Sequence, residues 1–194
     1  MYIMQGAQEY RNLYLIDICK LAGQYGEIAF KDEKFYYIAK IPFSQNALVG
    51  IAGEIISVVK AIMGKIIKCV ITDLDNTLWG GIIGDDGLEG IQIGELGDGH
   101  AFTEIQRWLK ELKNRGILLA VCSKNNEDTA KLPFEKHPEM ELKLSDFAVF
   151  VANWDDKAAN ICKIQQILNI GMDSIVFLDD NPRERDVVRT LIPE

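Results

Sequence analysis

Four short apolar runs, each followed by a polar turn and then by a stretch with helical periodicity, constrain the fold of this chain more than any other feature. The runs cover residues 66–72, 117–122, 147–151 and 174–178. Continuous apolar character is typical of strands that are buried on both faces of a parallel sheet. The alternation therefore predicts an α/β fold with a doubly wound, Rossmann-like parallel sheet.

The helices between and after these strands are expected at residues 101–115, 127–136, 156–168 and 182–191. Asp155 is expected to cap the third of these helices, and Gly116 is expected to end the first. Residues 78–100 contain eight glycines, so we expect this segment to form a flap without a helix.

The first 64 residues follow a different, mainly helical pattern. Apolar residues recur at helical spacing over residues 7–24, which predicts a first helix there. Ser44 is expected to cap a second helix that runs to about Met63, where Gly64 ends it. At 194 residues, against about 150 per domain, the chain is expected to be one large domain or one domain plus a fragment. The change of pattern after Gly64 places the expected boundary between residues 64 and 65.

The composition excludes several classes of partner. The net charge of −8 opposes binding to nucleic acid or to an anionic membrane surface. No uninterrupted apolar run approaches the roughly 18 residues of a membrane span. The four cysteines form no C-x-x-C pair, which favours reduced thiols and a cytoplasmic location.

Polar side chains follow each predicted strand. They are Asp73, Asp75 and Thr77 after the first run, Ser123 after the second, Lys157 after the third, and Asp179 and Asp180 after the fourth. Because the carboxyl ends of parallel strands carry the reactive groups of such sheets, we expect these side chains to converge on one site. Carboxylates packed closely repel one another, and a hard divalent cation keeps them ionised, so Mg²⁺ is the expected cofactor, bound by Asp73, Asp75, Asp179 and Asp180.

These residue types suit phosphoryl transfer, whose transition state spreads negative charge over oxygen atoms. Asp73 is the expected nucleophile that forms an aspartyl-phosphate, and Asp75 is the expected general acid and base. Lys157 is expected to neutralise charge, whereas Thr77, Ser123 and Lys157 are expected to bind the phosphoryl group.

The segments VITDLDNT, LLAVCSKN, the Lys of NWDDK and VFLDDNP follow the order of the four motifs of the haloacid dehalogenase (HAD) superfamily, which this chain resembles. Within that superfamily, DLDNTLWGGIIGDDGLEGI, CSKNNED and NWDDKAANI resemble the FkbH-like subfamily. The resemblance implies an uncapped HAD-like phosphatase domain over residues 65–194. It also implies that residues 1–64 are the tail of a domain similar to the SGNH hydrolases.

For the activity, the resemblance implies a Mg²⁺-dependent phosphatase acting on an acyl phosphate or a phosphate ester. Glyceryl transfer from 1,3-bisphosphoglycerate to an acyl carrier protein is the reaction of the better-known relatives. Two alternatives stay open: a phosphatase of a phosphopeptide or another phosphorylated macromolecule, and a receiver-like module that accepts a phosphoryl group without turnover. Receivers lack a second Asp two residues after the phosphorylated Asp, because rapid hydrolysis of the phosphorylated form would defeat a switch. The presence of Asp75 therefore favours an enzyme over a receiver. Cys122 and Cys69 are either acyl acceptors or inert packing.

Overall fold

The computed structural model describes residue 10 and residues 12–193. The chain divides into two compact units, Met1–Ile66 and Ile67–Glu194. The origin of the first unit as a remnant of an SGNH-like domain stays a prediction.

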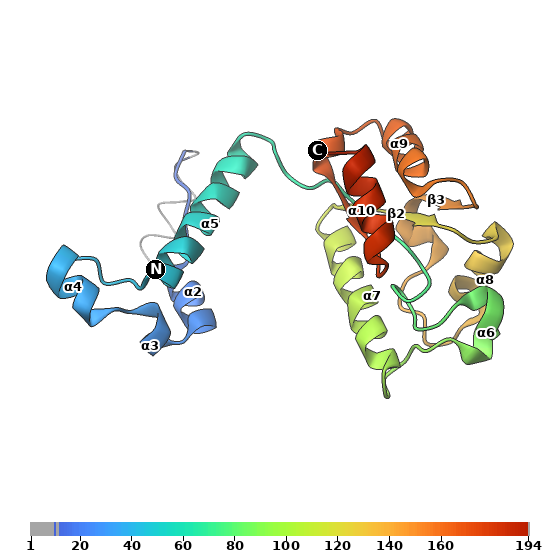
Figure 1. Ribbon diagram of the computed structural model, residues 1–194, viewed down its shortest axis with the longest axis horizontal. Helices are drawn as coiled ribbons and strands as arrows, with labels where there is room; N and C mark the ends of the chain where they lie inside the picture. The colour runs from blue at the N-terminus through green and yellow to red at the C-terminus, as the bar shows by residue number, and fades with distance from the viewer. Residues whose placement is uncertain (1–9, 11, 194) are drawn as a thin grey trace. The chain divides into compact units, whose positions relative to one another are not determined.

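The described part of the first unit is helical, with a small buried cluster formed by Leu21, Phe30 and Ala47. Its helices are α2 (Ile18–Tyr25), α3 (Glu27–Phe30), α4 (Glu33–Ala39) and α5 (Gln45–Ile62) (Figure 1). The predicted helix over residues 7–24 is wrong for residues 12–17, because Asp17 accepts a hydrogen bond from the Lys20 N–H at 2.9 Å and the helix begins after it. Residues 7–9 and 11 of that prediction lie outside the described residues.

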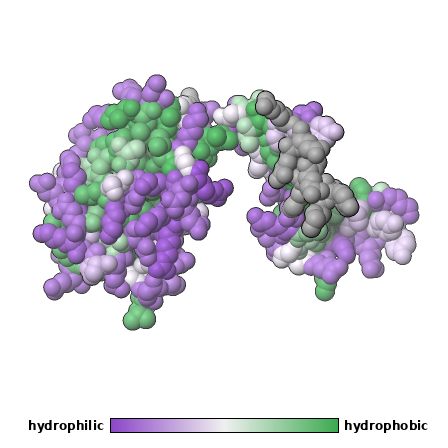
Figure 2. Space-filling view, turned by 180° about the vertical axis from the view of Figure 1, so that it is seen from behind, coloured by the Kyte–Doolittle hydropathy of each residue, from purple (hydrophilic) through white to green (hydrophobic). Residues whose placement is uncertain are grey.

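The prediction for α5 is confirmed, since Ser44 Oγ accepts a hydrogen bond from the Ala47 N–H at 3.2 Å. Judged by length and composition alone, α5 is also the one described helix that is long and apolar enough to cross a membrane, with a mean hydropathy of 1.3. An uninterrupted-run criterion does not detect it because Glu54 and Lys60 interrupt its apolar residues. Apolar side chains lie on the surface of both units, as Figure 2 shows in green.

The second unit contains a four-stranded parallel sheet in the order β3-β2-β1-β4, which confirms the predicted α/β fold. The strands are β1 (Cys69–Thr72), β2 (Leu118–Ser123), β3 (Phe147–Ala152) and β4 (Ile175–Leu178). The helices are α6 (Ile83–Gly90), α7 (Gly99–Asn114), α8 (Glu127–Lys136), α9 (Lys157–Leu168) and α10 (Pro182–Leu191) (Figure 1). Single 3-10 turns, η1 (Leu144–Asp146) and η2 (Met172–Ser174), precede β3 and β4.

Helices cover both faces of the sheet, as a doubly wound fold requires. On one face, Val70 of β1 packs in a cluster with Leu109 of α7 and Phe134 of α8. On the other face, Ile71 packs in a second cluster with Ile161 of α9. Because neighbouring residues of β1 point to opposite clusters, the whole strand is buried, which explains its continuous apolar sequence.

Two local predictions in this unit are wrong. Residues 78–100 were expected to contain no helix, yet they contain α6, in which the Asp86 carboxylate accepts a hydrogen bond from the Ile82 N–H at 2.7 Å and Gly87 interrupts the helix at φ 66°. Asp155 was expected to cap α9, but Asp156 is the cap and accepts from the Ala158 N–H at 2.8 Å. Gly116 follows the end of α7 with φ 94°, as expected for a terminating glycine.

Candidate active site

The polar residues at the strand ends meet at the carboxyl edge of the sheet. The Asp73 N–H donates to the Leu178 carbonyl at 2.8 Å, which joins the end of β1 to the end of β4. Ser123 ends β2, and Lys157 is the first residue of α9 after β3. A cavity of about 590 Å³ opens here, and its lining includes Asp73, Asp75, Ser123, Lys157 and Asp180.

Lys157 is the buried cation of this site. Its Nζ lies 2.9 Å from Asp73 Oδ2 and 2.6 Å from Asp179 Oδ2, and its side chain is 5% exposed. Burial alone would lower the pKa of Lys157, but the charges of Asp73 and Asp179 outweigh it and raise that pKa. Lys157 is therefore a permanent positive charge beside Asp73.

Three carboxylates form a group that could hold a metal ion. Oxygen atoms of Asp73, Asp179 and Asp180 lie within 4.8 Å of one another. Asp73 Oδ1 is buried and has no hydrogen-bond partner within the described part of the chain. Burial raises the pKa of Asp73, against the opposing effect of Lys157. A buried oxygen without a donor, in an all-carboxylate set, fits a hard divalent cation such as Mg²⁺.

Asp75 lies outside this three-carboxylate group. Its Oδ1 accepts hydrogen bonds from Trp79 Nε1 at 2.9 Å and from the Ile83 N–H at 3.0 Å. Its Oδ2 accepts one from Asn125 Nδ2 at 3.0 Å. Burial raises the pKa of Asp75, and the hydrogen bonds from Ile83 and Trp79 oppose that shift. The sequence predicts Asp75 as both a metal ligand and a general acid and base, and both roles stay predictions.

The two predicted hydroxyl groups differ in position. Ser123 is 2% exposed and lines the cavity. Thr77 Oγ1 instead accepts a hydrogen bond from the Asp180 N–H at 3.1 Å, and Thr77 is not among the cavity-lining residues in the described chain. Thr77 therefore orients Asp180, whereas Ser123 faces the space a substrate would occupy.

Several residues near the site are absent from the sequence-based prediction. Lys124 and Asn125 follow Ser123 directly, and Lys124 Nζ lies 2.7 Å from Glu184 of α10. Arg185 Nη1 donates to the carbonyls of Asp179 at 2.5 Å and Asp180 at 2.8 Å. Lys124 and Asn125 follow a strand end, and Arg185 lies in the first turn of α10, so their positions could have indicated a place near the site. The signal is weak, because polar residues are common in such loops.

Cys69 and Cys122 show no sign of activation. Cys122 is fully buried, and its Sγ lies 3.7 Å from the Lys157 carbonyl rather than in the cavity lining. Burial raises the pKa of Cys122 to about 12 and that of Cys69 to about 11. Burial therefore disfavours the reactive thiolate form of both cysteines, which fits packing groups better than acyl acceptors.

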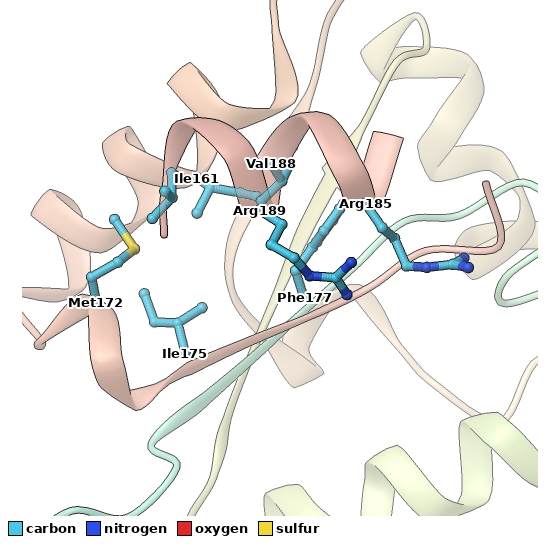
Figure 3. A pocket seen from close by; sticks show the side chains of 8 residues that line it. Ile161, Met172, Ile175, Phe177, Arg185, Val188 and Arg189 are labelled. Atoms are coloured by element: carbon cyan, nitrogen blue, oxygen red, sulfur yellow. The ribbon is translucent and has the colours of Figure 1, made fainter. Parts of the chain in front are cut away.

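A second hollow lies between α9, β4 and α10. It measures about 210 Å³, and apolar side chains such as Ile161, Ile175 and Phe177 line it together with Arg185 and Arg189 (Figure 3). No acidic or thiol side chain lines it among the described residues. The chemistry of the molecule is therefore expected at the carboxyl edge of the sheet.

The similarities to known proteins include a family match and a solved structure. Residues 1–60 match the family described as FkbH, N-terminal domain. Over 99% of its length the chain resembles a crystal structure of the N-terminal part of the protein BF1531 from Bacteroides fragilis, described as containing a phosphatase domain and complexed with Mg, with a TM-score of 0.93 and 54% sequence identity. The match covers 51% of that chain, so the present chain spans about half the length of that structure. No curated protein matches the chain.

These similarities support the predicted resemblance to FkbH-like proteins. The absence of a cap domain and the SGNH-like origin of the first unit stay predictions.

Proposed function

We propose that this chain is a Mg²⁺-dependent phosphoryl-transfer hydrolase that works through an aspartyl-phosphate on Asp73. The observation that carries the proposal is the buried Asp73 carboxylate, with Lys157 at 2.9 Å on one oxygen and no partner among the described residues on the other. The likeness to a phosphatase-containing structure complexed with Mg supports the same reaction class.

The proposed reaction has two steps. A carboxylate oxygen of Asp73 attacks phosphorus while the bond from phosphorus to the leaving oxygen breaks, and Asp75 gives that oxygen a proton. Water then attacks the phosphorus of the aspartyl-phosphate while Asp75 takes a proton from the water. The bond between phosphorus and the Asp73 oxygen breaks, inorganic phosphate departs, and the Asp73 carboxylate is regenerated. Lys157 and Ser123 hold the phosphoryl oxygens in both steps.

Asp73, Asp179 and Asp180 would hold the Mg²⁺ ion, with Thr77 and Arg185 fixing the backbone that carries the last two. When bound, Mg²⁺ would neutralise the charge that develops on the phosphoryl oxygens. Among the described residues, the three carboxylates of this group have the Lys157 ammonium beside two of them, so a divalent cation suits the remaining negative charge.

The substrate is proposed to be a phosphorylated small molecule, either an acyl phosphate or a phosphate ester. The match of residues 1–60 to the FkbH N-terminal domain favours the more specific reaction. In it, the C3 phosphate ester of 1,3-bisphosphoglycerate is hydrolysed, and the thiol of an acyl carrier protein displaces the C1 phosphate to form a glyceryl thioester. Because burial disfavours the thiolate form of both cysteines, transfer directly to the carrier thiol is the favoured route, rather than transfer through Cys122.

The experiment is phosphate release from p-nitrophenyl phosphate and from 1,3-bisphosphoglycerate with holo acyl carrier protein, with and without Mg²⁺. We expect metal-dependent release that Asp73→Asn abolishes, together with a glyceryl mass gain on the carrier. Phosphate release without a mass gain on the carrier would indicate a phosphatase without glyceryl transfer, and its remaining candidate substrates include phosphopeptides. A long-lived phosphorylated protein without turnover would favour the receiver-like alternative, and release by Asp73→Asn would refute the proposed nucleophile.

A further inference from the structure

We propose that Asn125 is a positioning residue that orients Asp75 and fixes which of its oxygens exchanges the proton with the leaving group. This inference rests on the proposed phosphoryl transfer and adds a residue that the sequence motifs leave unassigned. It starts from the three hydrogen bonds that hold the Asp75 carboxylate.

The three donors come from two segments of the chain. Trp79, which is fully buried, and Ile83, the first residue of α6, both donate to Oδ1 at 2.9 and 3.0 Å. Asn125, from the loop after β2, donates to Oδ2 at 3.0 Å. A carboxylate has about four acceptor positions, two on each oxygen. The two donors fill Oδ1, so the remaining position lies on Oδ2, beside the Asn125 amide.

The orientation of the Asn125 amide follows from its other contact. Asn125 Oδ1 accepts a hydrogen bond from the Asn126 N–H at 2.9 Å, so the NH₂ group must face Asp75. Asn125 is 5% exposed, and its neighbour Asn126 caps α8 by accepting from the Asp128 and Thr129 N–H groups. The amide is therefore held in one position before a substrate arrives.

This geometry assigns the transferred proton to Oδ2. A proton on Oδ1 would compete with the two N–H groups that already occupy its acceptor positions. Oδ2 has one acceptor position that no donor among the described residues occupies, so a proton fits there. Oδ2 with the Asn125 amide beside it is then the side of Asp75 that faces the leaving oxygen. Asn125 acts through Asp75, so its removal should matter most when the leaving oxygen needs a proton.

Leaving groups of different acidity test this assignment. p-Nitrophenolate departs readily without a proton, whereas the alkoxide of glycerol phosphate does not. Asn125→Asp keeps the side-chain shape and the oxygen that accepts from Asn126, but it loses the donor to Asp75. Asn125→Ala loses the donor without adding a charge, and Asn114→Asp, at the exposed end of α7, controls for the added charge.

We expect both Asn125 variants to lower kcat/KM by about tenfold or more for glycerol phosphate and by less than about threefold for p-nitrophenyl phosphate, because kcat/KM reports on the step in which the leaving group departs and not on the later hydrolysis. Asp75→Asn should give the same pattern with a larger loss, about 100-fold on glycerol phosphate. Asn114→Asp should leave both rates unchanged.

Equal losses on both substrates in the Asn125 variants, or no loss on either, would overturn the positioning role. A uniform loss of kcat/KM in Asp75→Asn would also overturn it, because Asp75 would then not be the proton donor in the step in which the leaving group departs. Failure of the proposed function is visible separately, since Asp73→Asn would then still release phosphate. A melting curve for each variant with Mg²⁺ identifies any loss that comes from unfolding.

Discussion

At the scale of single residues, Lys157 keeps two buried carboxylates from repelling each other. Lys157→Met preserves the length of the side chain but leaves Asp73 and Asp179 without their cation. We expect turnover to fall at least about 100-fold and the free energy of unfolding in EDTA to fall by about 3 kcal/mol. Mg²⁺ should restore part of that stability, because it supplies positive charge to the same oxygens.

Lys163→Met is the matched control on the same helix. Lys163 pairs with Asp155 at 3.3 Å, and both side chains are more than half exposed. Exposed pairs contribute little, so this variant should change stability by less than about 0.5 kcal/mol. Equal losses from the two substitutions, in urea unfolding with EDTA, would refute the special position of Lys157.

Asp146 gives a pH-dependent prediction away from the site. Its carboxylate accepts from Lys113 Nζ at 2.5 Å and from the Lys143 N–H at 2.7 Å. Burial opposes these contacts, but they outweigh it and hold the pKa of Asp146 below its ordinary value of 3.8. A lowered pKa means that the charged form stabilises the fold above the unfolded-state pKa and that this contribution is lost as the pH falls through the folded-state pKa.

Asp146→Asn should therefore destabilise the protein by about 1 kcal/mol at pH 7. The difference from the unmodified protein should disappear as the pH falls below 3.8. Urea unfolding at pH 7, 5 and 3 measures it. Asp186→Asn, which removes an exposed pair with Arg189, serves as a control that should show little difference at any of these pH values. A difference that grows toward low pH would contradict the assignment.

At the scale of elements, the cap of α9 decides where Lys157 stands. Asp156 accepts from the Ala158 and Ala159 N–H groups, and Lys157 is the first helical residue after it. Asp156→Ala should lower stability by about 1 kcal/mol and reduce phosphatase activity, because the turn that carries Lys157 loosens. Asp155→Ala removes the adjacent carboxylate, which caps nothing, and should leave both quantities nearly unchanged. Thermal melts and phosphate release measure the pair.

The elements with strong periodicity could be predicted from the sequence. The strands and α8 to α10 fall within a few residues of their expected bounds. The strands could be predicted because burial on both faces of the sheet requires apolar runs, and the helices because single capping residues indicate where they begin. The helix α6 could not be predicted, because its start depends on the Asp86 side chain binding the Ile82 N–H across a glycine-rich segment. The cap of α9 was misplaced by one residue because Asp155 and Asp156 are chemically identical.

The candidate site follows the same division. Convergence of Asp73, Lys157 and the Asp179–Asp180 pair could be predicted, since parallel strands end at one edge. The orientation of Asp75 could not, because Trp79, Ile83 and Asn125 determine it and Asn125 lies 50 residues away in the chain. Long-range hydrogen bonds of this kind leave no spacing pattern in a single sequence.

At the scale of the whole molecule, the two units carry different spectroscopic probes. All six tyrosines precede Ile66, and all three tryptophans, Trp79, Trp108 and Trp154, follow it. Each unit also has buried clusters of its own, and that of the first unit is small. Tryptophan emission therefore reports on the unit with the sheet, and near-ultraviolet tyrosine signals report on the first unit.

These probes allow metal binding to be located without any turnover. Mg²⁺ that binds Asp73, Asp179 and Asp180 should raise the melting temperature seen by tryptophan emission, and at 100 times its Kd it should add about 2.7 kcal/mol to the stability of that unit. The tyrosine signal should move less, because the carboxylates belong to the other unit. EDTA should reverse the shift, and Asp179→Asn should weaken it. A shift that is equal for both probes would mean that the ion does not act on the second unit alone. A shift that survives in Asp73→Asn/Asp179→Asn would mean that the ion binds elsewhere, because this variant lacks two of the three carboxylates proposed to hold it.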